Sequence, residues 1–362
     1  MRIAVLGAGA GGAAATADLT LQGHAVRLWN RSPATLEPFR VLGGVGYEGL
    51  PGTGLAVPET ITADLSEAIE GADAALVCLP AIAHEEVAIR LASAGASLPI
   101  VLDPGHTGGA LHFRRVFLEA GAALPPLAAL STLTYVARKY APDTVTVSGL
   151  AERVHAACLP GGERALDLAQ ELFPAARRAP DVLAVDLADV NLVLHPPGAL
   201  LGAAWVEATG GDFLFYAEGV TPGVARVIAA LDAERLAVAR AFGHELDPLH
   251  REMAAIGTAD REAAARDDLA GAVRLGQANA RIRAPDSLAH RYYEEDLGYG
   301  LVPLLELARV AEVETPVTSS LVALGGALLG RDLVHEGLNA ARLGIDGLDR
   351  DALLALVRGG AP

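Results

Sequence analysis

Cysteine and lysine are both scarce in this chain of 362 residues. Cys78 and Cys158 are too few for a disulfide framework or a cysteine-based metal cluster, and we predict no metal site. Of the 28 basic residues, only Lys139 is a lysine. The sequence therefore excludes enzymes that rely on a catalytic lysine in the C-terminal half of the chain.

Long apolar runs and an excess of positive charge are also missing. The best candidate for a membrane span, Ala74 to Leu79, stops at Pro80, far short of the roughly 18 residues that a span needs. Met1 leads directly into the first predicted strand, so no signal peptide is predicted. The formal net charge of −16 argues against nucleic acid and anionic membranes as partners. These absences predict a cytoplasmic protein with small-molecule partners.

Apolar residues, in contrast, are abundant. They make up 52% of the chain against 20% charged residues, which is enough to form ordinary hydrophobic cores. A length of 362 residues predicts about two domains.

Glycines cluster directly after a short apolar strand that ends at Leu6. Gly7, Gly9 and Gly12 follow the pattern G-x-G-x-x-G, and the segment from Ala13 to Leu21 predicts a helix. In a dinucleotide-binding turn the first glycine makes the tight turn, the second lets the backbone approach a pyrophosphate, and the third lets helix and strand pack closely. We therefore predict that these glycines bind a nicotinamide or flavin dinucleotide at the N-terminus of the helix.

The end of the second predicted strand, Ala25 to Trp29, bears on cofactor choice. Sites that prefer NAD usually place an acidic residue here, but this chain continues with Asn30, Arg31 and Ser32. Arg31 is suited to stack on adenine or pair with a 2′-phosphate, and Ser32 to add a hydrogen bond. We therefore predict NADP, with NAD as the alternative; Arg31 as a solvated loop residue is the structural alternative.

Another cofactor contact is predicted where the apolar strand from Ala74 to Leu79 ends. In open α/β sheets the ligand crevice lies at the carboxyl ends of the strands, so Pro80 is predicted to contact the cofactor. His84, a little further on, is either a second such contact or only the start of a helix.

Beyond about Val185 the strand patterns stop and helix start signals take over, such as Thr221-Pro222 and Thr315-Pro316. The predicted fold is α/β. A Rossmann-type, doubly wound and mostly parallel sheet spans residues 1–184, and an all-helical substrate domain spans residues 185–362.

Several stretches of the second half are atypical of a simple core. One is Asn191 to Gly198, with a histidine in an apolar segment; another is Phe213 to Gly219, where Tyr216 and Glu218 interrupt aromatic residues. The third is Arg291 to Gly300, which is rich in charges and aromatic rings. Each also has a structural explanation, since a buried histidine is usually a core residue and a charge run is usually a solvated face.

Together these stretches resemble the opine dehydrogenases of the octopine/nopaline type, almost from end to end. The matching segments are Gly7–Gly12, Pro80–His84, Pro104–Leu111, Asn191–Gly198, Arg291–Asp296 and Gly300–Pro303. The glycine pattern is shared by many families, whereas the His-Pro and Arg-Tyr-x-x-Glu-Asp segments are more specific.

The resemblance implies reductive condensation: the amine of an amino acid joins a 2-oxo acid, and NAD(P)H reduces the imine. It also implies that His195 is the acid/base residue, that Asp296 is its carboxylate partner and that Arg291 holds a substrate carboxylate. A homodimer through the helical domain is a further family-based expectation.

Reduction of a carbonyl or an imine by a hydride requires the same residue types. Reduction of C=O or C=N needs a proton donor beside the hydride acceptor, and histidine titrates near neutral pH. A carboxylate on the other ring nitrogen selects the tautomer and stabilises imidazolium. A guanidinium binds a carboxylate with two parallel hydrogen bonds.

Other functions remain open from the sequence, although one related group is disfavoured. Glycerol-3-phosphate, ketopantoate and β-hydroxyacid dehydrogenases rely on a catalytic lysine in the helical half. No lysine follows Lys139 in this chain, which argues against that group. A 2-oxo acid reductase, an imine reductase or amine dehydrogenase, and a non-catalytic NAD(P) sensor are the alternatives. The segment from Leu130 to Tyr135 is only broadly similar to the corresponding loop of the family. The resemblance therefore does not indicate which amino acid this chain uses as substrate.

Overall fold

The computed structural model describes residues 1–360. They form two compact units. Unit 1 contains Met1–Gly105 and Gly109–Val182, and unit 2 contains His106–Gly108 and the described chain from Leu183 onward. The boundary between residues 184 and 185 that the sequence suggests stays a prediction.

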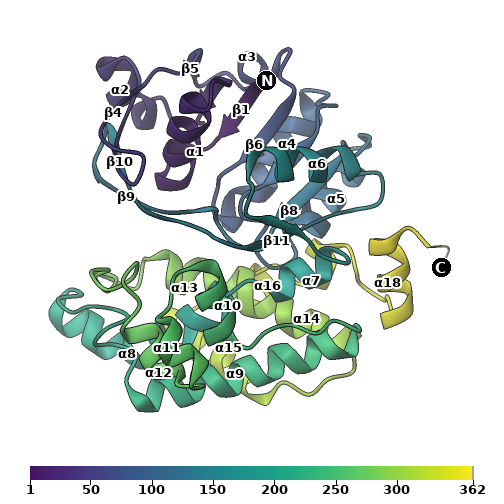
Figure 1. Ribbon diagram of the computed structural model, residues 1–362. Coiled ribbons are helices and arrows are strands. Elements are labelled where there is room, and N and C mark those ends of the chain that lie inside the picture. The colour runs from purple at the N-terminus through teal and green to yellow at the C-terminus, as the bar shows by residue number, and fades with distance from the viewer. Residues whose placement is uncertain (361–362) are drawn as a thin grey trace. The chain divides into compact units, whose positions relative to one another are not determined.

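Unit 1 is built on an eight-stranded sheet with the order β12-β11-β8-β7-β6-β1-β2-β5 (Figure 1). Neighbouring strands run parallel, apart from the antiparallel pair β8 and β11. This arrangement confirms the predicted Rossmann-type, mostly parallel sheet. The strands are β1 Arg2–Leu6, β2 Ala25–Trp29, β5 Thr60–Thr62, β6 Ala74–Val77, β7 Ile100–Leu102, β8 Leu127–Leu130, β11 Val154–Cys158 and β12 Ala176–Arg178.

A second, four-stranded sheet of unit 1 has the order β4-β3-β10-β9. Its strands are β3 Val45–Gly49, β4 Gly54–Ala56, β9 Tyr135–Ala141 and β10 Thr144–Leu150. The pairing of β3 with β10 is parallel and joins distant parts of the chain, as the bond between Glu48 and Thr146, 98 positions apart, illustrates. Sequence patterns do not reveal such pairings, and this sheet was not predicted.

Helix α1 packs against β1 and β2 of the first sheet and against β3, β9 and β10 of the second. Burial on two sides explains why its sequence is almost entirely small and apolar, with Ala13, Ala14 and Ala15 buried. The helices of unit 1 are α1 Ala10–Leu21, α2 Pro33–Leu42, α3 Leu65–Ile69, the short 3₁₀ turn η1 Ala81–Ala83, α4 His84–Ser93, α5 Gly109–Glu119 and α6 Glu163–Leu172.

Unit 2 is helical, and the residues described in it form no strand beyond an isolated bridge between Leu214 and Arg283. The elements from the end of unit 1 onward are α7 Val182–Leu187, α8 Asn191–Thr209, α9 Pro222–Ala241, α10 Leu249–Ile256, α11 Arg261–Ala265, α12 Leu269–Arg274, α13 Arg291–Glu295, the π-helical stretch η2 Asp296–Leu301, α14 Val302–Val310, α15 Pro316–Leu329, α16 Leu333–Glu336, α17 Ala340–Leu343 and α18 Arg350–Arg358.

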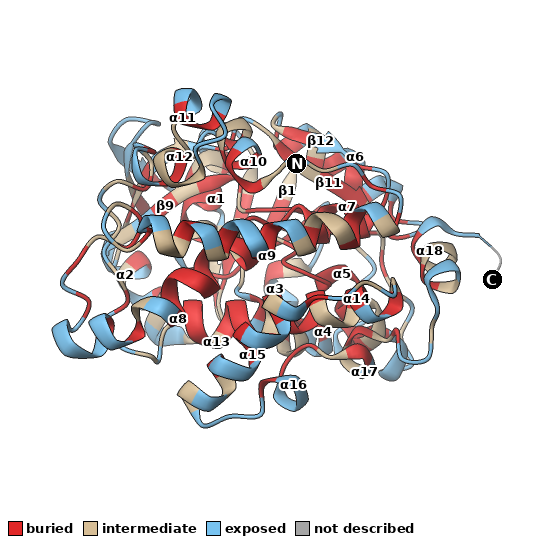
Figure 2. Ribbon diagram, turned by 90° about the horizontal axis from the view of Figure 1, so that it is seen from below, coloured by how far each residue is buried: buried red, intermediate tan, exposed pale blue. Residues whose placement is uncertain are grey.

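Helix α9 shows how local signals and burial agree in unit 2. The Thr221 hydroxyl accepts a hydrogen bond from the Val224 N–H and so caps the helix, with Pro222 at its first position. Along its length buried and exposed residues alternate, as Figure 2 shows. The apolar side, with Ile228 and Leu231 fully buried, packs against α8 and α15.

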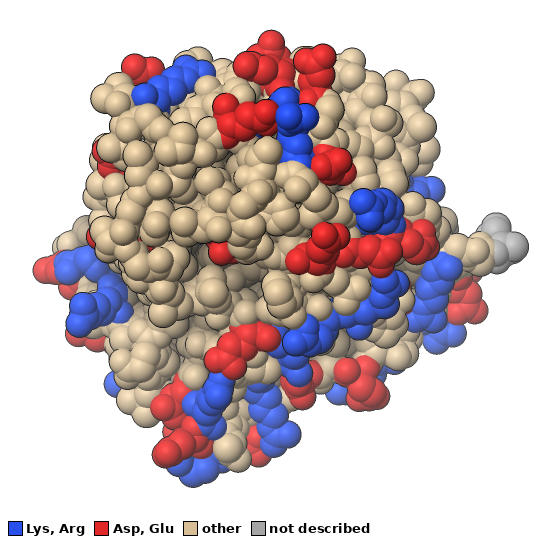
Figure 3. All heavy atoms as spheres, turned by 45° about the horizontal axis from the view of Figure 1, so that its top comes forward, with Lys and Arg blue, Asp and Glu red and all other residues tan. Residues whose placement is uncertain are grey.

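Within residues 1–360 no single helix is long and apolar enough to cross a membrane. The bent pair Pro316–Leu329 and Leu333–Leu343 passes that test only when both helices are taken together, and only on length and composition. On the face shown in Figure 3, basic and acidic side chains lie interspersed, with broad uncharged areas between them.

Candidate functional site

The glycine-rich turn after β1 has a separate reason for each of its predicted glycines. Gly7 has φ +119°, and a Cβ there would lie 2.4 Å from the Cys78 carbonyl oxygen. A Cβ on Gly12 would lie 1.8 Å from the Gly7 carbonyl oxygen. A Cβ on Gly9 would meet nothing within 4 Å. Gly7 and Gly12 are therefore needed for the fold itself, while Gly9 borders open space.

Gly9 is also the N-cap of α1. The first backbone bond of the helix runs from the Ala13 N–H to the Gly9 carbonyl, at 2.9 Å. The N–H groups ahead of Ala13 have no intrahelical acceptor, as at any helix start, and the helix dipole adds partial positive charge there. Open space beside Gly9 at a helix N-terminus fits the pyrophosphate of a dinucleotide.

The predicted 2′-phosphate contacts lie at the end of β2. Ser32 is the N-cap of α2 and makes no side-chain cap bond. Arg31, with 62% of its side chain exposed, forms an ion pair with Glu86 of α4. Glu86 also accepts a hydrogen bond from Arg90 at 2.9 Å, and this bond, with help from Arg31, holds the pKa of Glu86 below its usual range. The sequence reasoning missed Glu86.

Pro80 is exposed and lies between the end of β6 at Val77 and the turn η1, of which it is the N-cap. His84 is 1% exposed; its Nε2 donates to the Leu79 carbonyl at 3.3 Å, and its ring meets Phe113 edge to face at 5.4 Å. The structure thus favours the packing role for His84. Lys139 also lies in unit 1, with its Nζ 4.3 Å from the centre of the Phe39 ring.

In unit 2 the structure brings His195 and Asp296 together, although they are 101 positions apart. The ring Nδ1 of His195 lies 2.8 Å from the Asp296 Oδ2, and each side chain is 4% exposed. Burial raises the pKa of Asp296 well above its usual range; the positive charge of Arg291 opposes this shift and the negative charge of Glu295 adds to it. The two side chains therefore form their hydrogen bond in a water-poor environment.

Glycines and an irregular helix make this approach close. A Cβ on Gly300 of η2 would lie 3.2 Å from the Cβ of Leu192 on α8, so a larger residue would push the two elements apart. Gly198 similarly leaves room for Phe215, whose ring a Cβ there would meet at 2.9 Å. Asp296 begins the π-helical stretch, and such wide turns inside helices often occur at functional sites.

Two tyrosines complete the surroundings of His195. The His195 Nε2 lies 2.9 Å from the Tyr216 hydroxyl, which in turn lies 3.2 Å from the Tyr292 hydroxyl. The Tyr292 ring stacks on the imidazole with the ring centres 3.9 Å apart. Neither tyrosine was predicted as a site residue, although both lie in segments that the sequence singled out as unusual.

Beside this pair lies a second histidine–carboxylate pair. Glu295, 1% exposed, has its Oε1 3.3 Å from the Nε2 of His106 and its Oε2 3.5 Å from the Nε of Arg291. The Arg291 side chain is 48% exposed. Nearby, burial raises the pKa of Asp189 to about 6, while the charge of His106 opposes the shift. His106 and Glu295 lie in the segments that resemble the family but were assigned no role, and Asp189 was not singled out, because their contacts arise only in the fold.

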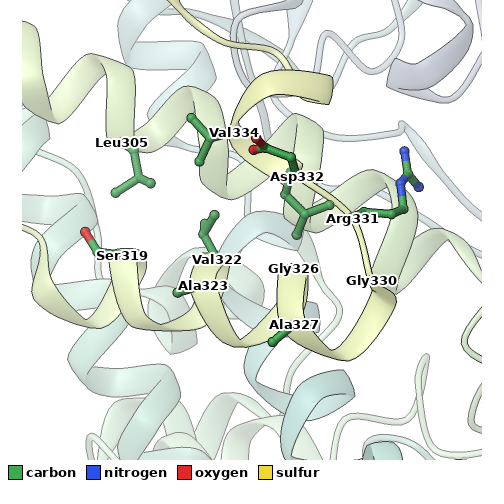
Figure 4. A pocket seen from close by; sticks show the side chains of 11 residues that line it. Leu305, Ser319, Val322, Ala323, Gly326, Ala327, Gly330, Arg331, Asp332 and Val334 are labelled. Carbon is green, nitrogen blue, oxygen red and sulfur yellow. The ribbon is translucent and has the colours of Figure 1, made fainter.

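A separate groove of unit 2 lies away from these pairs. It has a volume of about 620 Å³ and opens between α14, α15 and the segment that leads into α16 (Figure 4). Its lining is mostly apolar and includes Val322, Val334 and the charged residues Arg331 and Asp332. None of its lining residues belongs to the charged cluster around His195 and Glu295.

Two family models match the chain. The model of the NAD-dependent glycerol-3-phosphate dehydrogenase N-terminus matches residues 2–102, which include the glycine-rich turn. The model of the alpha-helical domain of NAD/NADP octopine/nopaline dehydrogenase matches residues 178–329, which include both histidine-pairing carboxylates.

Known proteins resemble the chain over nearly its whole length. An opine dehydrogenase from Arthrobacter sp. (strain 1C) is 34% identical over 351 residues, 95% of each chain. The structure of octopine dehydrogenase in complex with NADH and agmatine has a TM-score of 0.76 at 22% identity and covers 100% of this chain and 99% of that one. Yersinopine dehydrogenase with NADP⁺ bound has a TM-score of 0.68 at 18% identity, covering 99% and 97%.

Proposed function

This chain belongs to the opine dehydrogenase family and is an NAD(P)-dependent oxidoreductase acting on CH–NH bonds; from that premise we propose that it condenses an amino acid with a 2-oxo acid and reduces the resulting imine. The observation that carries the proposal is the buried pair of His195 and Asp296 at 2.8 Å. A non-catalytic sensor would not need a buried histidine–aspartate pair.

The glycine-rich turn is the proposed coenzyme site. Gly7, Gly9 and Gly12 and the N-terminus of α1 would hold the pyrophosphate, and the exposed Pro80 would contact the coenzyme. When bound, the nicotinamide coenzyme supplies the hydride. Arg31 and Ser32 support a preference for NADP over NAD, since a guanidinium and a hydroxyl both suit a 2′-phosphate.

His195 is the proposed acid/base residue. During condensation the amine nitrogen bonds to the carbonyl carbon, and the carbonyl oxygen leaves as water with both amine protons. Reduction then adds a hydride to the imine carbon and one proton to the nitrogen. Asp296, bonded to Nδ1, would keep the Nε2 of His195 turned toward these proton transfers and stabilise the imidazolium.

Tyr216 extends the proton path. With the Nδ1 proton directed at Asp296, the Nε2 of His195 accepts a hydrogen bond from the Tyr216 hydroxyl. The stacked Tyr292 limits rotation of the imidazole. We propose that the substrate's reacting oxygen or nitrogen exchanges its proton with His195 directly or through the Tyr216 hydroxyl.

Arg291 is the proposed anchor for a substrate carboxylate. Its Nε lies 3.5 Å from the Glu295 Oε2, and a guanidinium carries four further N–H donors on its terminal Nη groups. A planar pair of N–H donors matches the two oxygens of a carboxylate. Fixing the 2-oxo acid in this way would orient its carbonyl carbon for the attack by the amine.

The test is a panel of substrate pairs with NADPH and, separately, NADH. Oxidation of the coenzyme that needs both a 2-oxo acid such as pyruvate and an amino acid is the expected result. Oxidation with the 2-oxo acid alone would assign a hydroxyacid dehydrogenase, and oxidation with an amine plus a non-acidic carbonyl compound an imine reductase. Tight coenzyme binding without oxidation by any pair would assign a sensor.

Two further expectations stay predictions. One is a homodimer through the helical domain, which light scattering of the purified protein measures. The other is a cytoplasmic location, which fractionation of cells that produce the protein measures.

A further inference from the structure

Glu295 is a buried carboxylate that the proposed reaction does not use. Its side chain is 1% exposed, and one oxygen faces the imidazole of His106 while the other faces the guanidinium of Arg291. Removing a carboxylate from water costs several kcal/mol unless positive partners compensate. Glu295 therefore depends on both neighbours, and the position of the half-exposed Arg291 depends on Glu295.

His106, the other partner of Glu295, lies in a closely packed loop. It lies in the loop before α5 with φ +55°, a conformation that few residues other than glycine adopt. The next glycine, Gly108, has φ +81°, and a Cβ there would lie 2.4 Å from the Leu343 side chain. The loop is thus packed closely into unit 2, and His106 itself is 6% exposed.

We propose that Glu295 and His106 are positioning residues that fix Arg291 for the carboxylate of the 2-oxo acid. The Oε1 of Glu295 lies 3.3 Å from the Nε2 of His106, and its Oε2 lies 3.5 Å from the Nε of Arg291. Glu295 would thus hold the arginine through its Nε, and the N–H donors of the Nη groups would bind the substrate carboxylate. This inference rests on the proposed function, which assigns the carboxylate to Arg291.

Glu295 is separated in role from its neighbour Asp296. The two consecutive carboxylates face different histidines, His106 and His195, because α13 ends at Glu295 and the π-helical stretch begins at Asp296. The first would act on substrate binding through Arg291 and the second on proton transfer through His195. Kinetics distinguishes these roles, since lost positioning raises KM and lost acid/base catalysis lowers kcat.

The experiment compares Glu295→Gln with Glu294→Gln, which makes the same chemical change one position earlier on α13. Glu295→Gln should raise the KM of the 2-oxo acid about tenfold or more and lower kcat less, with the KM of NADPH nearly unchanged. Glu294→Gln should leave all constants near those of the wild type. A fall in kcat at constant KM, or equal effects of both variants, would overturn the proposal.

His106→Asn provides the second arm, because asparagine tolerates the left-handed conformation and is too short to reach Glu295. It should raise the same KM, and the double variant with Glu295→Gln should be little worse than Glu295→Gln alone, since the two residues act as one unit. Additive effects would contradict a shared role. A loss of thermal stability in either variant with an unchanged KM would assign a purely structural pair.

A binding measurement separates this inference from the proposed function. Oxamate, an amide analogue of pyruvate, is titrated calorimetrically into the full-length protein saturated with NADPH. Weaker oxamate binding by Glu295→Gln than by wild type and Glu294→Gln would support the positioning role even if no substrate pair is turned over. Equal oxamate affinity in all three proteins would overturn it even if the wild type is an active opine dehydrogenase.

Discussion

The glycine-rich turn of unit 1 and the charged cluster of unit 2 are built in opposite ways. The turn is contiguous, and Gly7 and Gly12 are needed there because backbone atoms leave no room for a Cβ. The cluster gathers residues from distant stretches, with His195 and Asp296 101 positions apart. A local turn is encoded by its own residues, whereas the properties of the cluster depend on burial that the rest of unit 2 provides.

The largest expected effect concerns the cluster. His195→Ala should lower kcat by about 10³-fold, within the range for loss of a positioned acid/base group, and change the affinity for NADPH by less than about twofold. Steady-state kinetics and coenzyme titration measure the two quantities. Far-UV circular dichroism checks the fold, and near-normal turnover by a folded variant would refute the role of His195.

Within the turn, Gly12→Ala and Gly9→Ala should separate folding from coenzyme binding. At Gly12 the added Cβ would meet the Gly7 carbonyl oxygen at 1.8 Å, so we expect a loss of stability on the order of 3 kcal/mol. At Gly9 the fold has room, so stability should stay within about 1 kcal/mol of wild type. Gly9→Ala should nevertheless weaken NADPH binding about tenfold, because its Cβ occupies the space proposed for the pyrophosphate.

Urea unfolding without coenzyme and coenzyme titration measure these two effects. If Gly9→Ala unfolds the protein as much as Gly12→Ala, the assignment of separate roles to the two glycines is wrong.

Buried carboxyl groups extend the comparison to pH. In unit 1, burial raises the pKa of Asp103 to about 7, although the N–H and the hydroxyl of Thr134 donate hydrogen bonds to it. The folded protein favours the neutral acid. The stability that the neutral Asp103 contributes to the fold is therefore fully present below about pH 4, near its ordinary pKa, and is lost as the pH rises through about 7.

Asp103→Asn should remove that loss, because asparagine is neutral and can keep both bonds to Thr134. Between pH 5.5 and pH 7 the stability of the wild type should fall relative to the variant by about 1.5 kcal/mol, at about 1.4 kcal/mol per pH unit. Urea unfolding at both pH values measures the difference. Parallel pH dependence of the two proteins would show that Asp103 is ionised throughout.

The smallest expected effect concerns coenzyme choice. Glu86 pairs with Arg31 on the surface, and exposed pairs of this kind are weak. Glu86→Gln should release Arg31 from its ion pair and remove a negative charge near the proposed 2′-phosphate site. The ratio of kcat/KM for NADPH to kcat/KM for NADH should therefore rise about threefold, which corresponds to the strength of an exposed ion pair. Arg31→Ala should lower the same ratio. An unchanged ratio in both variants would remove Arg31 from the coenzyme site.

Much of the fold was predictable from short-range signals. The strand, glycines and helix after Met1 follow one another in the chain, and the caps at Thr221 and Asp349 form the bonds that their residue types suggest. The second sheet was not predictable, since β3 and β10 are distant in the chain and neither has a pattern that identifies its partner.

The site divides in the same way. His195, Arg291 and Asp296 were named because their segments resemble a known family, and the structure places the histidine against the aspartate. Tyr216, His106 and Glu295 lie in segments that the sequence singled out, but the sequence assigned none of them a role. Their importance arises from the partners that they meet at 2.9 Å and 3.3 Å.

By itself, the sequence determined that this protein has a dinucleotide turn, a helical second half, no lysine beyond Lys139 and a histidine available for acid/base chemistry. Only the tertiary structure decided which carboxylate faces which histidine and that burial raises the pKa of Asp296. The reason is that the glycine turn depends on local backbone sterics, whereas the pKa of a side chain depends on the water and charges that the whole fold leaves around it.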